Sequence, residues 1–212
     1  MKKIILYSAL LATGIATAAT PIDGWYGSAF GGYAYLPSFL HKWHKGFFLT
    51  DDRYENNFDA GLSFGFKSTP LRYEGELTYI QARLKSFNAN GFKHKHAHGF
   101  NRTGLAMANI YYDFPAIVPT IEPFLGIGIG YSHITGSFNS RHPLFRTHYD
   151  TSNNVFAYQA IAGLTYNFAE TWALNVGYRY IATNHANNFG RSFQANLANL
   201  GLVYRFDGNI YK

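Results

Sequence analysis

Glu74 and Glu76 are the residues whose type and spacing most directly suggest chemistry. They are two positions apart, in a stretch in which apolar residues alternate with polar or charged ones. In an extended chain both carboxyl groups point to one face, and paired carboxyl groups are used in acid and base catalysis. Arg179 lies in a similar stretch. Buried charges require partners, so we predict an interior ion-pair network of these three residues, with no catalytic role.

A second group of charged residues lies near the ends of stretches in which apolar residues alternate with others. We predict that these residues form a second ion-pair network: Lys67, Arg72, Asp113, Glu122 and Arg205. The run from Gly126 to Gly130 has glycine at every second position. It lacks the spacing of a dinucleotide-binding loop, so we interpret these glycines as space for a bulky neighbour such as Tyr111 or Arg179.

Three histidines form the one candidate metal site. His94, His96 and His98 alternate with other residues, and in an extended segment their side chains share a face about 6.6 Å apart. Imidazoles bind zinc, copper or nickel, but the intervening lysines oppose a cation. The main expectation is therefore no metal and no cofactor.

Basic residues concentrate in the long segments between the alternating stretches. These segments and their flanks hold 11 Lys and Arg against 4 Asp and Glu, a net charge of +7, and eight of the nine histidines. The residues predicted to contact polyanions or lipopolysaccharide phosphates are Arg83, Lys85, Lys93, Lys95 and Arg102. Contact with a polyanion should strengthen at acidic pH, where histidines become charged. The overall charge of +6 is mild for a nucleic-acid partner, and none is expected.

Eight stretches of period-two alternation must position these residues. They predict antiparallel strands over residues 24–36, 57–67, 71–84, 102–113, 121–135, 155–168, 172–183 and 192–206. The connections alternate between short turns and long segments, the latter being 37–56, 85–101, 136–154 and 184–191. This arrangement predicts an all-β fold: an eight-stranded antiparallel up-and-down transmembrane barrel with its short turns at one end.

The two faces of the strands indicate what surrounds the barrel. One face is continuously apolar, whereas the other mixes small and ionisable residues. Aromatic residues lie at both ends of the apolar face, as in Trp172 and Tyr180, with aliphatic residues such as Val176 between them. Two aromatic rings around an aliphatic band are typical of a surface that faces lipid. The alternative is a soluble lipocalin-type barrel, which would place the large apolar residues inside.

Composition and the N-terminus agree with export to a membrane. Hydrophobic residues make up 47% of the chain, yet no run after the first fifteen residues approaches the roughly 18 apolar residues of a spanning helix. Lys2 and Lys3 precede an apolar stretch that ends at Ala16-Thr17-Ala18. This pattern predicts a cleaved signal peptide over residues 1–18 and a barrel domain over residues 19–212. The chain has no cysteine, which excludes disulfides and thiolate chemistry.

Several segments resemble the small eight-stranded outer-membrane barrels of Gram-negative bacteria, the OmpA-like and opacity-type surface proteins. They are Gly24-Trp25-Tyr26-Gly27, residues 109–114, residues 123–131, Gly177-Tyr178-Arg179-Tyr180 and the last strand ending in Phe206. The resemblance implies an outer-membrane surface protein without enzymatic activity, in contact with lipid and lipopolysaccharide. It also implies adhesion or host contact through the loops, a role in membrane integrity, and recognition of Phe206 by the barrel assembly machinery.

Two other functions remain as alternatives. His185-Ala186-Asn187-Asn188 is loosely similar to the His-x-Ser-Asn site of eight-stranded lipid A deacylases. However, Asn187 stands where the nucleophile is expected, and its side-chain amide cannot replace a serine hydroxyl as the nucleophile. A narrow ion channel is the second alternative, and it requires a continuous polar lumen. Eight strands enclose an interior that side chains can fill, so an open pore is not expected.

Overall fold

The structure is a computed structural model. It describes residues 22–36, 41–44, 47–89, 92–94, 98–142, 145–186 and 191–206. Side chains are described for residues 22–36, 57–82, 102–135, 152–184 and 192–206. The predicted signal peptide, residues 1–18, lies outside the described residues.

Eight long strands dominate the described part of the chain. They are β1 (Gly24–Tyr35), β3 (Phe47–Ser68), β4 (Leu71–Ala89), β6 (His98–Asp113), β7 (Ile121–His142), β8 (Phe145–Asn167), β9 (Trp172–Ala186) and β10 (Arg191–Arg205). Each pairs antiparallel with its neighbour in this order. Two short strands, β2 (His41–His44) and β5 (Phe92–His94), pair with the ends of β3 and β4. Within the described residues, no helix is long and apolar enough to cross a membrane.

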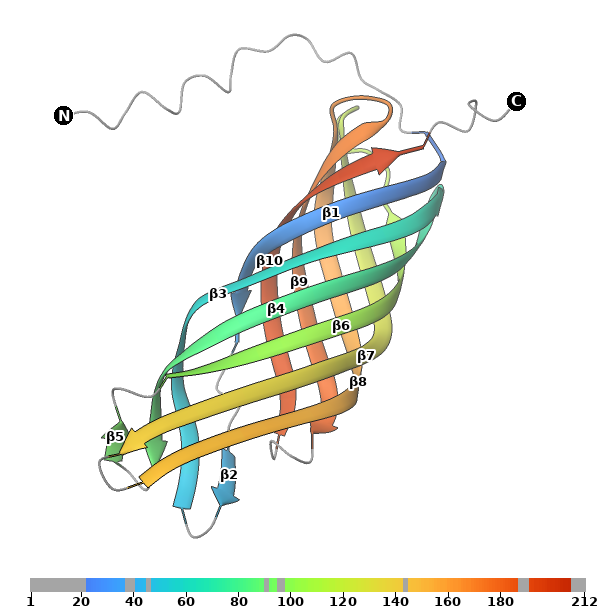
Figure 1. Ribbon diagram of the computed structural model, residues 1–212. Helices are drawn as coiled ribbons and strands as arrows, with labels where there is room; N and C mark the ends of the chain where they lie inside the picture. Colours follow the sequence, from blue (N-terminus) through green and yellow to red (C-terminus); the bar gives the residue numbers. More distant parts are fainter. Residues whose placement is uncertain are drawn as a thin grey trace, which may run out of the picture.

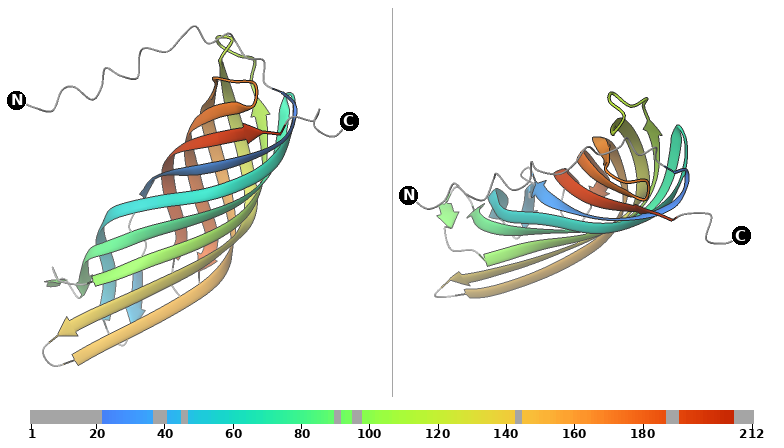
Figure 2. Two further views of the ribbon diagram at one scale, coloured as in Figure 1. Left: turned by 45° about the horizontal axis from the view of Figure 1, so that its top comes forward. Right: turned by 90° about the horizontal axis from the view of Figure 1, so that it is seen from above.

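The sheet closes on itself because the first strand pairs with the last. β1 and β10 are in register from Tyr26 opposite Arg205 to Tyr35 opposite Asn196. The amide of Phe206 continues this ladder by donating to the carbonyl oxygen of Trp25 at 2.9 Å. The tilted strands form a ring with the short turns at one end and the long hairpins at the other (Figures 1 and 2). The predicted eight-stranded antiparallel barrel is confirmed.

The strands are longer than predicted at the end of the long hairpins. β7 and β8 stay paired as far as His142 opposite Phe145, although residues 136–154 were predicted to form a loop. β3 likewise begins at Phe47, ten residues before the predicted start. These boundaries were wrong because the extensions carry polar residues on both faces, so the apolar alternation that marks a strand is absent there.

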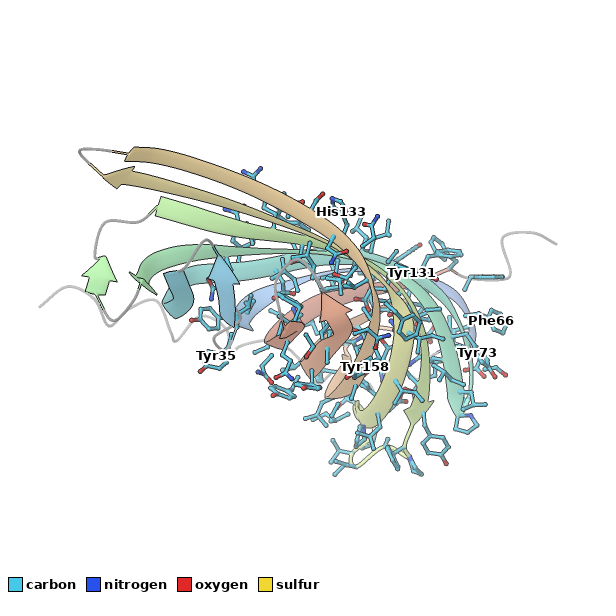
Figure 3. All side chains as sticks on the ribbon, turned by 90° about the horizontal axis from the view of Figure 1, so that it is seen from below. Tyr35, Phe66, Tyr73, Tyr131, His133 and Tyr158 are labelled. Atoms are coloured by element: carbon cyan, nitrogen blue, oxygen red, sulfur yellow. The ribbon has the colours of Figure 1, made fainter. Side chains whose placement is uncertain are left out.

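The outer surface of the barrel is apolar. Leu62, Ile127 and Tyr131 are 63%, 65% and 69% exposed, and large aliphatic and aromatic side chains on every long strand are similarly exposed. Phe66 and Tyr73, near the short-turn end, and Tyr131 belong to this surface (Figure 3). The apolar face of the strands therefore points outward. A lipocalin-type arrangement, with that face inward, is contradicted.

The interior has two halves of different character. Toward the short turns it is charged and polar, as predicted. Toward the long hairpins it holds an apolar cluster that the sequence reading missed, which we call the apolar plug: Ala34, Leu36, Ile80, Ala82, Leu105, Met107, Ile134, Val155, Ala157, Ile181, Phe193, Ala195 and Leu197. The prediction of small and ionisable residues along the whole inner face was therefore wrong for this half.

Candidate functional site

Glu76 lies at the centre of the polar half of the interior. It projects inward from β4 and is only 2% exposed. One carboxylate oxygen accepts from Arg179 Nη1 and, at 2.5 Å, from the Thr78 hydroxyl. The other accepts from Asn109 Nδ2 at 2.8 Å and from Gln159 Nε2 at 3.3 Å. Four strands thus contribute to one buried carboxylate, and both of its oxygens are satisfied.

Glu74 has different partners from those we expected. Instead of pairing with Arg179, its carboxylate accepts from the hydroxyl of Tyr26 at 2.9 Å and from that of Tyr111 at 3.0 Å. The Tyr111 ring in turn lies 4.6 Å from the guanidinium carbon of Arg72. The structure therefore brings Glu76 and Arg179 together, and it pairs Glu74 with tyrosines that sequence reasoning did not identify. The amide of Asn109 links the two carboxylates by donating to both, at 3.4 Å to Glu74 and 2.8 Å to Glu76.

The second predicted group of charges lies at the short-turn end of the lumen. Lys67 Nζ is 3.3 Å from Asp113 and 3.0 Å from Glu122, and Arg72 Nε donates to Asp113 at 2.8 Å. Arg205 instead donates to the side-chain oxygen of Asn167 at 2.6 Å. Four of the five predicted residues are thus joined by ion pairs.

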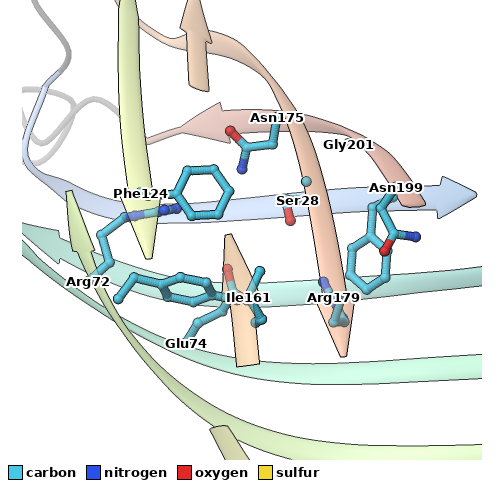
Figure 4. Close-up of a pocket in the computed structure, with 12 residues that line it drawn as sticks. Ser28, Arg72, Glu74, Phe124, Ile161, Asn175, Arg179, Asn199 and Gly201 are labelled. Atoms are coloured by element: carbon cyan, nitrogen blue, oxygen red, sulfur yellow. The ribbon is translucent and has the colours of Figure 1, made fainter. Parts of the chain in front are cut away.

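A small cavity lies between the two charged groups (Figure 4). Its volume is about 40 Å³, enough for about three water molecules. Arg72, Glu74 and Arg179 line it, together with the side-chain amides of Asn175 and Asn199. Buried atoms without a protein partner lie on its lining residues, including Arg72 Nη2 and Arg179 Nε. The cavity has no room for an organic substrate beside the carboxylates, and this geometry does not favour acid and base catalysis there.

The alternating glycines of β7 make room for the polar cluster. A Cβ atom built on Gly126 would lie 2.3 Å from the ring of Tyr111, and one on Gly128 would lie 1.9 Å from Asn109 Oδ1. Tyr111 therefore occupies the predicted space. Asn109, rather than Arg179, is the second neighbour.

The rim residues are only partly described. Arg102 lies exposed on β6. The backbones of Arg83 and Lys85 belong to β4, those of Lys93 and His94 to β5, and that of His98 to the start of β6, but these side chains lie outside the described part. Lys95 and His96 lie wholly outside it. Among described residues, no group of three or more His, Asp or Glu side chains could hold a metal ion.

The segment similar to the deacylase motif is likewise only partly described. His185 and Ala186 form the end of β9, and their side chains are outside the described part. Asn187 and Asn188 lie outside it entirely.

Comparison with known proteins finds uncharacterized bacterial relatives and one matching protein family. The chain is 27% identical over 154 residues to uncharacterized proteins of Brucella abortus, Brucella suis and Brucella melitensis, covering 63% of this chain. It spans about half (54%) of the length of these relatives. Residues 5–206 match the family described as the outer membrane protein beta-barrel domain.

Solved structures share the same fold. Neisserial surface protein A is 17% identical with a TM-score of 0.58, over 87% of this chain and 98% of that one. Ail of Yersinia pestis, in complex with the heparin analogue sucrose octasulfate, is 15% identical with a TM-score of 0.54, over 86% and 100%. OprG of Pseudomonas aeruginosa is 11% identical with a TM-score of 0.52, over 88% and 99%. The chain belongs to the outer membrane protein β-barrel domain family, and it is a β-barrel of the Gram-negative outer membrane.

Proposed function

We propose that the protein is a non-enzymatic surface protein that binds anionic polymers through its basic, histidine-rich long-hairpin end. The observation that carries this proposal is the charge asymmetry of the chain: a net +7 at the hairpin end and −3 over the rest of the predicted mature chain. A surface rich in lysine and arginine attracts polyanions such as sulfated polysaccharides and lipopolysaccharide phosphates. The heparin analogue bound to the structurally similar Ail barrel is a ligand of this class.

The barrel supports this role as a rigid base. β4 and β6 hold Arg83, Lys85 and Arg102 close together, since Arg83 pairs with Phe100 and Gln81 with Arg102 across the two strands. The wall itself fills the membrane and, in our proposal, contributes to its integrity. We further propose that the assembly machinery recognises the last strand at Phe206, whose ring packs against Phe64 and Tyr204 at the seam between β1 and β10.

Heparin binding is expected to depend on one loop and on pH. Replacing Arg83, Lys85, Lys93 and Lys95 with alanine should weaken binding about 10-fold or more, because four cationic contacts are lost. Binding by the wild type should strengthen between pH 7.5 and 5.5, as loop histidines with a reference pKa of about 6.5 become charged. Surface plasmon resonance on immobilised heparin measures both effects.

The control for this experiment is a charge change in another long hairpin. Lys42 of β2 and Lys45 belong to the segment 37–56, whose net charge is zero, and their replacement with alanine should change affinity less than about twofold. Replacing His94, His96 and His98 with asparagine should remove most of the pH dependence. Equal losses from the two sets of lysines, or equal binding at both pH values, would contradict the proposal.

The barrel is not expected to conduct ions. A channel needs a continuous polar path, and the apolar plug blocks the lumen on the side of the long hairpins. Purified protein in planar bilayers should show no current steps above baseline, under conditions in which a porin gives clear steps. Stable unitary currents from the folded barrel would instead support the channel alternative.

A further inference from the structure

A groove crosses the outer wall of the barrel near the long-hairpin end. Its volume is about 770 Å³, and its floor includes the small residues Ala60, Gly104 and Ala106. A Cβ atom built on Gly104 would meet nothing within 4 Å. The groove therefore exists because glycine and alanine occupy positions where neighbouring strands carry large side chains. We call it the β6 groove, after the strand that forms its centre.

The strand register explains the walls of this groove. Gly104 pairs with Tyr79 of β4 on one side and with His133 of β7 on the other. One outward position further toward the short turns, Ala106 lies between Leu77 and Tyr131 in the same way. Small residues on one strand are thus flanked by large ones on both sides. The result is a narrow slot that runs along β6 and could hold an extended hydrocarbon chain.

The length of the slot suits a lipid tail. Ala108 lies beyond the residues that line the groove, between Gly75 of β4 and Ile129 of β7, and it continues the series of small outward residues on β6. The strip from Gly104 to Ala108 spans about 13 Å along the strand. This is close to half of the roughly 30 Å hydrocarbon core of a bilayer. The strip begins at the level of the long-hairpin aromatic residues, and in outer-membrane barrels the longer loops are extracellular. The groove therefore lies in the outer leaflet.

Polar groups stand at the hairpin end of the slot. His133 Nδ1 and Asn154 Oδ1 are 2.6 Å apart, and this contact orients the imidazole at the edge of the groove. Arg102 lies one outward position above Gly104 on β6. Among the outward-pointing strand side chains that the structure describes, Arg102 is the one Lys, Arg, Asp or Glu. The charge that the described outward face carries is therefore a cation, and it lies next to the groove.

We propose that the β6 groove binds lipid A, the phosphorylated and multiply acylated anchor of lipopolysaccharide. One acyl chain lies over Gly104, Ala106 and Ala108, and a glucosamine phosphate contacts Arg102 and His133. The outer-leaflet position and the charge both select this lipid, because Arg102 complements a phosphate while the slot below accepts only apolar groups. This site adjoins the surface to which we assign polyanion binding and shares Arg102 with it, whereas the acyl-chain slot over Gly104 and Ala106 is distinct from that surface.

A second groove on the same barrel serves as an internal control. It has a volume of about 500 Å³, and Leu125, Ala160, Ala162 and Tyr178 of β7, β8 and β9 contribute to its lining. Its lining residues include no arginine, lysine or histidine. It should therefore take lipid tails without selecting a headgroup.

Native mass spectrometry of the folded protein with added lipid A tests the proposal. Gly104→Leu fills the β6 groove, and we expect at least a 10-fold loss of lipid A binding. Ala106→Leu, a second variant that fills the same groove, should behave alike. Ala162→Leu fills the control groove and should change binding less than about twofold. The heat-dependent gel shift verifies that each variant is folded, and unchanged heparin binding by Gly104→Leu separates this site from the loop surface.

The headgroup contact is tested with two more lipids. The double variant Arg102→Gln, His133→Gln should lower the affinity for lipid A but not for dephosphorylated lipid A. Phosphatidylglycerol should bind the wild type at least 10-fold more weakly than lipid A. Equal effects of Gly104→Leu and Ala162→Leu, loss of both lipid A forms in the double variant, or equal binding of phosphatidylglycerol would each overturn the proposal.

Discussion

Replacing Glu76 with alanine is expected to destabilise the folded barrel by about 3–5 kcal/mol, the usual cost of removing one partner of a buried ion pair. The change leaves the Arg179 guanidinium in the lumen without its carboxylate. It also removes the acceptor for Thr78, Asn109 and Gln159. Glu76→Gln preserves the shape but not the charge, and its effect should be smaller. Urea titration in detergent, followed by the heat-dependent gel shift, measures the free energy of unfolding.

Two controls separate charge burial from a general effect of mutation. Glu170 lies exposed in the turn before β9, and its replacement with alanine should change stability by less than about 0.5 kcal/mol. The double variant Glu76→Met, Arg179→Met removes both charges and should recover most of the lost stability. A Glu76→Ala protein as stable as the wild type would show that the polar cluster does not hold the barrel together.

Replacing Gly130 with alanine is the second change with a large expected effect. A Cβ atom at this position would lie 2.0 Å from the carbonyl oxygen of Ala106, an atom of the paired strand that cannot move without disturbing the ladder. Overpacking of this kind typically lowers the free energy of unfolding by about 1–3 kcal/mol. Because the contact here is with the backbone, we expect a loss of about 3 kcal/mol. The same unfolding titration is the measurement.

Gly104 supplies the matched control, because it occupies the neighbouring strand and its Cβ atom would be in open space. Gly104→Ala should leave stability within about 0.5 kcal/mol of the wild type. If both alanine variants were equally stable, β6 and β7 could move apart at Gly130 at little cost in free energy. That outcome would contradict the close contact seen in the structure.

The sequence predicted the strands well where only one face of the strand contacts lipid. β9 is the clearest case: Trp172, Val176 and Tyr178 are exposed on the outside, whereas Ala173 and Arg179 are buried inside. The short-turn ends of the strands were also predicted within about two residues. Alternation is strong there because a hydrocarbon surface tolerates almost no polar side chain.

The same reasoning explains where the prediction failed. Beyond Thr135 in β7 both faces of the hairpin carry polar residues, so the strand continues without an apolar face to reveal it. The apolar plug was missed for the opposite reason. Ile134 and Ile181 belong to strands that are apolar outside, and a second set of apolar residues inside weakens the alternation.

The site could be predicted only to the level of residue types. Charges on the inner face had to pair, and this argument reached the second network and the contact between Glu76 and Arg179. The partners of Glu74 depend on the register of three strands. Tyr26 and Tyr111 lie 48 and 37 residues from it in the chain. No local sequence pattern indicates the register between strands that are so far apart in the chain, so the tyrosines were not identified.

The pairing of the first strand with the last has a consequence for the order of events during folding. Hairpins such as β7 and β8 can form early, since their partners are adjacent in the chain. Tyr26 meets Arg205 only after all the intervening strands have taken their places. Until then both edges expose amide and carbonyl groups that hydrocarbon cannot satisfy. We therefore expect passage into the bilayer and closure of the ring to be coupled, and the pairing of β1 with β10, which are far apart in the chain, to slow both.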